Sequence, residues 1–136
     1  MSYNPFRQIV KRLFSGRRSI RQPVPDVTEE DVVRIILRDF PQEEFDSIVA
    51  VLNKHGTEEW ERERPRVRLA VLKLANGNLE KLKQAIETAK RDCRDVVAAA
   101  EYPEYFRSWG RAELSRREAK RIIDADWLQF QTWLRQ

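Results

Sequence analysis

The stretch PRVRLAVLKLANG (65–77) decides the fold. Proline is well tolerated in the first turn of a helix, where the amide that it lacks has no intrahelical partner, and glycine suits the position just after a helix ends. Between these two residues, positions 67–75 place apolar side chains on nearly every face of a helix. A helix that is apolar all round is buried among other elements. We therefore expect a central helix that starts at Pro65; the alternative is a helix that begins near Thr57 and kinks at the proline.

Two amphipathic helices are expected before this centre. Thr28 is a suitable N-cap, and the three acids that follow it favour the positive end of a helix dipole. Pro41 ends that helix and starts the next, and Gly56 is expected to close the second helix. The predicted apolar stripes are Val32, Val33, Ile36, Leu37 and Phe40 in the first helix and Phe45, Ile48, Val49 and Leu52 in the second.

Downstream, one long helix is expected over residues 79–101, with a narrow apolar seam. The seam is made of Leu79, Leu82, Ile86, Ala89 and Cys93. Pro103 ends this helix, residues 104–114 read as a short aromatic connection, and Ser115 with Glu118 forms a capping box for a final helix. Four glycines in 136 residues leave few positions for tight hairpins. The sequence therefore predicts an all-α fold, an irregular bundle of about five to seven helices preceded by a basic amphipathic N-terminal helix.

The positive charge is concentrated at the N-terminus. The chain has a formal net charge of +4, yet residues 1–22 hold six of the 26 basic side chains and none of the 22 acidic ones, which leaves the remainder at −2. We therefore divide the chain into a basic arm and linker (1–22) and a single helical domain (23–136). Any binding to a polyanion is expected to depend on the arm.

The arm is expected to hold a short amphipathic helix over residues 5–14, with Asn4 as its N-cap. Its apolar face comprises Phe6, Ile9, Val10, Leu13 and Phe14, and the residues expected to contact a polyanion or a membrane are Arg7, Lys11, Arg12, Arg17, Arg18 and Arg21. A basic helix with such a face is typical of helices that lie on anionic membranes. The same charges suit nucleic-acid phosphates, an organelle-targeting segment, or an arm docked on the body or on a partner protein.

The sequence offers little for catalysis. With one histidine and one cysteine, a zinc site of the usual Cys/His type cannot form within one chain. Asp124 and Asp126 are two apart on a helix and so point to nearly opposite sides. No phosphate-binding glycine loop or nucleophile elbow is present. We predict no catalytic residue, no metal site, no cofactor and no small-molecule substrate.

The last third of the chain is rich in aromatic residues. Those that could form an interface with a partner protein are Tyr105, Phe106, Trp109 and Trp133. The alternative is that the aromatic side chains fill the joint between helix 79–101 and the final helix. The sequence leaves both interpretations open and gives more weight to packing, because the spacing is that of a helix facing a core.

The run LANGNLEKLKQAIETAKRDCRDVVAAAEYPEY (74–105) resembles small all-helical bacterial proteins. The resemblance implies a bacterial, cytoplasmic setting and no mechanism. Together these patterns predict a non-enzymatic protein-interaction module, of adaptor or immunity-protein type, whose basic arm provides localisation or polyanion contact. The alternatives are a small nucleic-acid-associated protein and a peripheral membrane protein at the inner face of the membrane.

Overall fold

Helix α4 lies at the centre of the molecule, as the sequence predicts. The computed structural model describes residues 20–56, 63–109 and 114–136. Within those ranges the chain forms seven α-helices and one 3-10 helix and contains no strand, which confirms the all-α prediction. The elements are α2 (Glu29–Asp39), η1 (Gln42–Glu44), α3 (Phe45–Leu52), α4 (Arg64–Ala75), α5 (Leu79–Arg91), α6 (Cys93–Glu101), α7 (Pro103–Ser108) and α8 (Arg116–Arg135).

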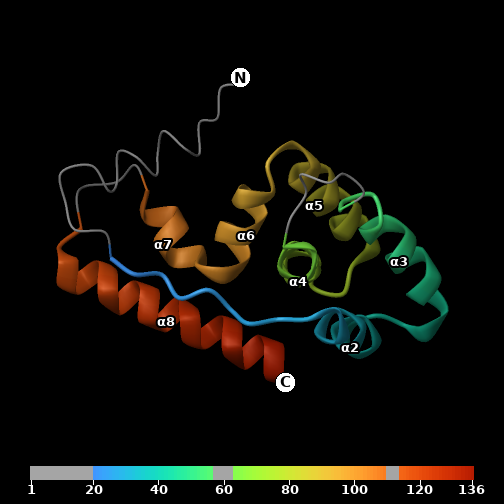
Figure 1. Ribbon diagram of the computed structural model, residues 1–136, viewed down its shortest axis with the longest axis horizontal. Coiled ribbons are helices and arrows are strands. Elements are labelled where there is room, and N and C mark those ends of the chain that lie inside the picture. The colour runs from blue at the N-terminus through green and yellow to red at the C-terminus, as the bar shows by residue number, and fades with distance from the viewer. Residues whose placement is uncertain (1–19, 57–62, 110–113) are drawn as a thin grey trace.

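Helices α2, α5 and α6 surround α4 (Figure 1). Six residues of α4 are buried, and Leu69, Ala70, Val71 and Leu72 have no exposed surface. Pro65 stands in the first turn of α4, so the helix starts there and does not continue from upstream. The expected cap at Thr57 and the expected N-terminal helix (5–14) lie outside the described residues.

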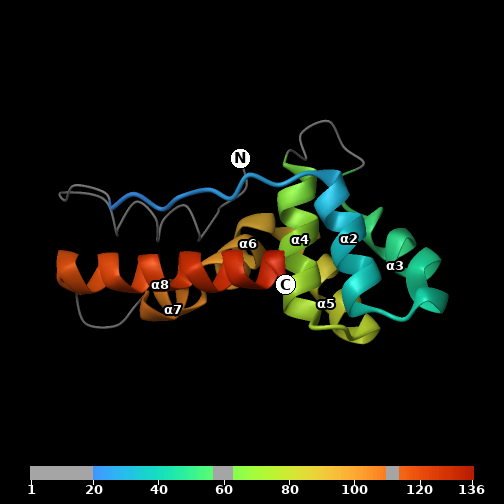
Figure 2. The ribbon, with the colours of Figure 1, turned by 90° about the horizontal axis from the view of Figure 1, so that it is seen from below.

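The apolar side chains form two clusters. The larger is centred on α4 and takes in residues from α2, α3, α5 and α6, together with Phe130 and Leu134 from the end of α8. The smaller lies between α7 and the first half of α8, around Tyr105 and Ile123. Helix α8 therefore joins the two clusters, and its N-terminal half projects away from the main core (Figures 1 and 2).

Residues 20–28 run alongside α8 in an extended conformation and lead into α2 (Figures 1 and 2). Ile20 packs against the smaller cluster, and the hydroxyl group of Tyr102 donates a hydrogen bond to the carbonyl oxygen of Pro23. Thr28 and Asp31 then form a capping box at the start of α2. The extended segment thus links the small cluster at one end of the molecule to α2 at the other.

The structure corrects the predicted apolar face of α2. Val32, Ile36 and Phe40 are buried as expected, but Ile35 is fully buried, whereas Val33 is 44% and Leu37 is 58% exposed. The pattern was ambiguous because apolar residues cover a wide arc of this helix. The buried side is the one that faces α4 and the C-terminal end of α8, and it includes Ile35.

Two further predictions about helix boundaries were wrong. The expected helix 79–101 is broken at Asp92, whose backbone is extended and whose carboxylate accepts a hydrogen bond from the amide of Arg94, so that Asp92 caps α6. The expected connection 104–114 contains helix α7. Proline at position 103 starts this helix, since proline is favoured in a first turn.

Candidate functional site: a basic pole and an acidic pole

Basic side chains gather at the start of α8. Residues 116–121 contain four basic side chains and one acidic one. Arg116, Arg117, Lys120 and Arg121 are all exposed, and so is Arg21 in the neighbouring extended segment. We call these five residues the basic pole. Sequence reasoning missed the four on α8, although the run RREAKR was a visible signal.

The stability of α8 does not explain these charges. Ser115 caps the helix by accepting a hydrogen bond from the amide of Glu118 at 3.1 Å. Arg116 and Arg117 then place positive charge in the first turn, where the helix dipole disfavours it by about 0.3–1 kcal/mol for each charge. Lys120 is compensated by Asp124, 2.7 Å away. The charges of Arg116 and Arg117 are therefore not ones that the helix itself favours.

The arm joins the described structure beside the basic pole. Ile20 and Leu114 both pack against the smaller cluster, and Figures 1 and 2 place the start of the extended segment next to the first half of α8. Among the predicted contact residues, Arg21 is exposed here. The others lie outside the described residues: Arg7, Lys11, Arg12, Arg17, Arg18 and the apolar face Phe6, Ile9, Val10, Leu13 and Phe14. The sequence places Arg17 and Arg18 only three and two residues before Ile20.

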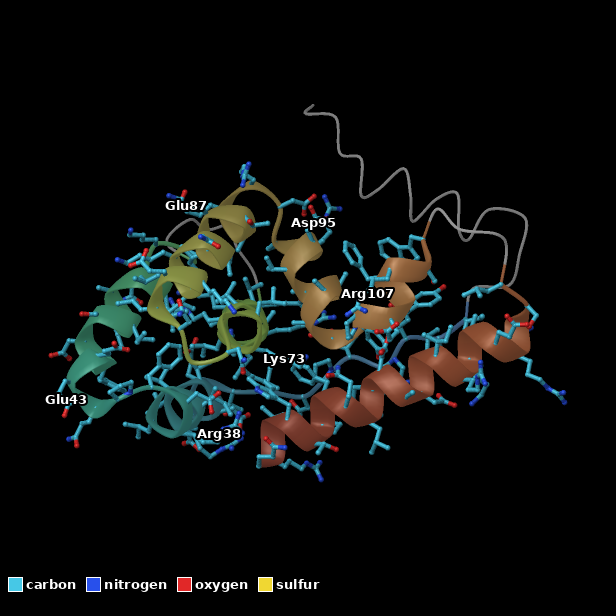
Figure 3. The ribbon with its side chains drawn as sticks, turned by 180° about the vertical axis from the view of Figure 1, so that it is seen from behind. Arg38, Glu43, Lys73, Glu87, Asp95 and Arg107 are labelled. Atoms are coloured by element: carbon cyan, nitrogen blue, oxygen red, sulfur yellow. The ribbon has the colours of Figure 1, made fainter. Side chains whose placement is uncertain are left out.

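Acidic side chains gather at the opposite end, over α2, η1 and α3. Residues 23–56 carry eight acidic and three basic side chains. Glu29, Glu30, Glu43 and Asp46 are exposed, and we call these four residues the acidic pole. Figure 3 shows Glu43 at the outer edge of the molecule, pointing away from the body. The start of α8 and the α2–α3 region lie at opposite ends of the long axis (Figure 1), so the body is electrostatically polarised.

A buried ion pair fixes the corner between α6 and α7. Arg66 of α4 donates two hydrogen bonds to the carboxylate of Glu101, at 2.8 and 2.7 Å, and Glu101 is only 1% exposed. Burial raises the pKa of Glu101, although Arg66 acts in the opposite direction. This pair links α4, at the centre of the main core, to the last residue of α6, two residues before α7 starts.

Two polar residues of α8 attach it to the same corner. Asp126 is 2% exposed and accepts a hydrogen bond from the amide of Tyr105 at 2.9 Å, so it caps α7 from a different helix. Burial raises the pKa of Asp126, and its hydrogen bonds to the α7 amides oppose that rise. Gln129 donates to the carbonyl oxygens of Ala100 and Glu101. These contacts hold α8, and with it the four basic-pole residues that it carries, in a fixed position on the body.

A third contact holds the end of α8. Arg38 donates to the carbonyl oxygen of Trp133 at 2.6 Å, and its guanidinium lies over the ring of Trp133, 5.3 Å from the centroid. The same group binds Asp39 at 2.7 Å. A cation at the carbonyl end of a helix is favourable. Arg38 therefore attaches α8 to α2.

The aromatic residues predicted as a partner interface are engaged within the molecule. Tyr105 is 5% exposed, and its ring meets that of Trp109 edge-on at 6.1 Å. Phe106 and Trp109 are half-buried, with ring centroids 5.0 Å apart. Trp133 packs against Phe130 and lies under Arg38. These contacts account for the aromatic set as packing, while a partner contact at the exposed parts of Phe106 and Trp109 stays a prediction.

Three features of the described residues bear on metal binding and on nucleophilic or acid–base chemistry. Within these residues no group of three or more His, Cys, Asp and Glu side chains is placed to hold a metal ion. Burial raises the pKa of the Cys93 thiol, which disfavours the reactive thiolate. Asp124 is exposed whereas Asp126 is buried, so the two do not form a dyad. Among the described helices, none combines the length and the apolar character needed to cross a membrane.

No protein-family model, curated protein or solved structure matches the chain.

Proposed function

We propose that this chain is a non-enzymatic helical adaptor that attaches to the inner face of the cytoplasmic membrane through its basic arm and basic pole. Its acidic pole then faces away from the membrane and is available to a protein partner. The observation that carries this proposal is the separation of charge along the long axis, with the arm joined at the positive end.

The electrostatic part of the proposal rests on exposed charge. Near an anionic lipid surface each Lys or Arg contributes about 1 kcal/mol. Arg117 and Arg121 are four residues apart in α8 and therefore project from the same exposed side of the helix. The arm, which joins this end of the molecule at Ile20, carries five further basic residues besides Arg21.

The apolar side chains of the arm favour lipid over nucleic acid. Phosphate contacts require only positive charge and hydrogen-bond donors. Five apolar side chains on one predicted helix face match the boundary between lipid headgroups and acyl chains. The predicted arm helix would be only ten residues long, and a segment of that length would bind weakly alone, so the pole on α8 supplies a second attachment point.

Binding of the full-length protein to vesicles tests the proposal. We expect co-sedimentation with vesicles that contain phosphatidylserine, little with pure phosphatidylcholine, and a decrease as the salt concentration rises. Equal binding to both vesicle types, or to neither, would show the proposal to be wrong. Tight binding to duplex DNA with a steep salt dependence, without a preference for anionic vesicles, would support the nucleic-acid alternative instead.

A further inference from the structure

The outer face of α2 combines exposed apolar side chains with acidic ones. Val33 and Leu37 are 44% and 58% exposed and stand four residues apart, so they are neighbours on one side of the helix. Glu29 and Glu30 lie one turn before them and are exposed as well. Glu29 is paired with Arg68 of α4 at 3.4 Å, and its side chain is 54% exposed. This face is therefore a short apolar stripe between a negatively charged helix start and the exposed Arg34, which pairs with Asp31 at 3.3 Å.

From these features we infer that the outer face of α2 binds the arm helix, residues 5–14, of a second copy of this chain. Residues 5–14 contain three basic side chains and no acidic one, and their predicted apolar face has the same 3–4 residue spacing as the stripe on α2. Basic groups beside an apolar stripe complement acidic groups beside an apolar stripe. Because the same arm binds lipid in the proposed function, this contact belongs to the protein that is not attached to the membrane.

Chain length argues against the same contact within one molecule. Six residue steps separate Phe14 from Ile20, and at ~3.3–3.6 Å for each step they span at most ~22 Å. Nine steps separate Ile20 from Glu29, and the extended segment carries them in one direction along α8 (Figure 1), which corresponds to ~28 Å at ~3.1 Å for each step. Leu13 and Phe14 of a chain therefore cannot reach its own α2, and only the N-terminal half of the arm segment 5–14 could do so. The arm of a second copy has no such limit.

The contact is heterologous, because the arm and the face of α2 are different surfaces. A protein that carries both surfaces adds copies head to tail until a ring closes. A copy with a defective arm can still accept an arm, and a copy with a defective α2 face can still donate one. Mixing these two variants must therefore stop at a 1:1 heterodimer.

Analytical ultracentrifugation of full-length proteins at low salt, without lipid, provides the test. We expect the weight-average mass of the intact protein to rise with concentration, to twice the 16.2 kDa of one chain or beyond. The arm variant Ile9→Ser/Leu13→Ser and the face variant Val33→Ser/Leu37→Ser should each stay monomeric. Their equimolar mixture should regain a species of twice the mass of one chain.

A control separates this contact from a general loss of surface apolarity. Leu128 of α8 is 66% exposed, so Leu128→Ser makes a similar change away from the α2 face and should associate like the intact protein. The inference is overturned if the intact protein stays monomeric, if the face variant associates as the intact protein does, or if the two defective variants do not complement each other. Because no lipid is present, each of these results leaves the vesicle test of the proposed function unaffected.

Discussion

Loss of the Arg66–Glu101 pair should destabilise the fold more at neutral than at acidic pH. The substitution Arg66→Met would leave a carboxylate that is 1% exposed without the two N–H groups that bind it at 2.7 and 2.8 Å. Removing one partner of a buried ion pair costs about 3–5 kcal/mol. The Arg66 side chain itself is 20% exposed, so water reaches the site and we expect the lower end, about 3 kcal/mol, at pH 7.

The pH dependence of this loss has a defined sign. Burial raises the pKa of Glu101 even with Arg66 present, and removing the guanidinium raises that pKa further. A carboxyl group with a higher pKa in the folded state stabilises the fold below its unfolded pKa, and this contribution is lost as the pH rises through the folded pKa. The cost of Arg66→Met should therefore be largest near pH 8 and shrink towards pH 5.

Urea unfolding followed by circular dichroism at several pH values measures both effects. The control is Arg107→Met, which removes an exposed pair with Glu104 (2.9 Å) and should change stability by less than about 0.5 kcal/mol at every pH. The double variant Arg66→Met/Glu101→Leu replaces both charges with apolar groups and should recover most of the loss. A loss below about 1 kcal/mol for Arg66→Met, or one that does not shrink towards pH 5, would refute the reasoning.

Three other perturbations test the fold and the proposals. Gly77→Ala should lower the free energy of unfolding in urea by about 1–3 kcal/mol, because Gly77 has φ +77° and an added Cβ would lie 2.9 Å from the carbonyl oxygen of Asp39. The neighbouring Asn76→Gly, at φ +49°, is the control and should be neutral within about 0.5 kcal/mol. Asp126→Ala should lower the free energy of unfolding by about 1–3 kcal/mol, because it leaves the buried amide of Tyr105 without its acceptor. Asp126→Asn keeps one oxygen and should lower it less. Equal losses of stability in the two variants would contradict the capping role of Asp126. Anionic vesicles should dissociate the self-associated protein, since one arm cannot lie on α2 and on lipid together; an oligomer that persists on the vesicles would contradict this competition.

The sequence predicted those parts of the fold that depend on local signals. Proline at position 65, threonine at 28 and serine at 115 each mark a helix start that the structure confirms. The apolar run around Leu69 predicted the centre of the core, because a helix with apolar side chains on nearly every face would expose some of them to water in any position at the surface.

Features that depend on tertiary contacts were not predictable in the same way. Which side of α2 is buried is decided by its neighbours, so Leu37 was expected inside and lies outside. The partner of Glu101 is 35 residues away in the chain, and periodicity carries no information about such pairs. A weaker signal existed for Asp126, which stands three residues after Ile123 and four before Phe130, both of them apolar residues on one side of α8. A carboxylate at such a position indicates a buried cap or ion pair. The separation of the two poles required the fold, because it arises from where α2 and α8 lie.

The most direct test of the central claim is the effect of two equal charge deletions on binding to phosphatidylserine vesicles. Arg117→Gln/Arg121→Gln removes two charges from the basic pole, and Lys81→Gln/Arg91→Gln removes two exposed charges from α5, outside it. At about 1 kcal/mol for each charge, the pole variant should bind roughly 30-fold more weakly than the intact protein, whereas the α5 variant should lose far less. Equal losses in the two variants would mean that only net charge matters and would contradict the assignment of the basic pole as the binding surface.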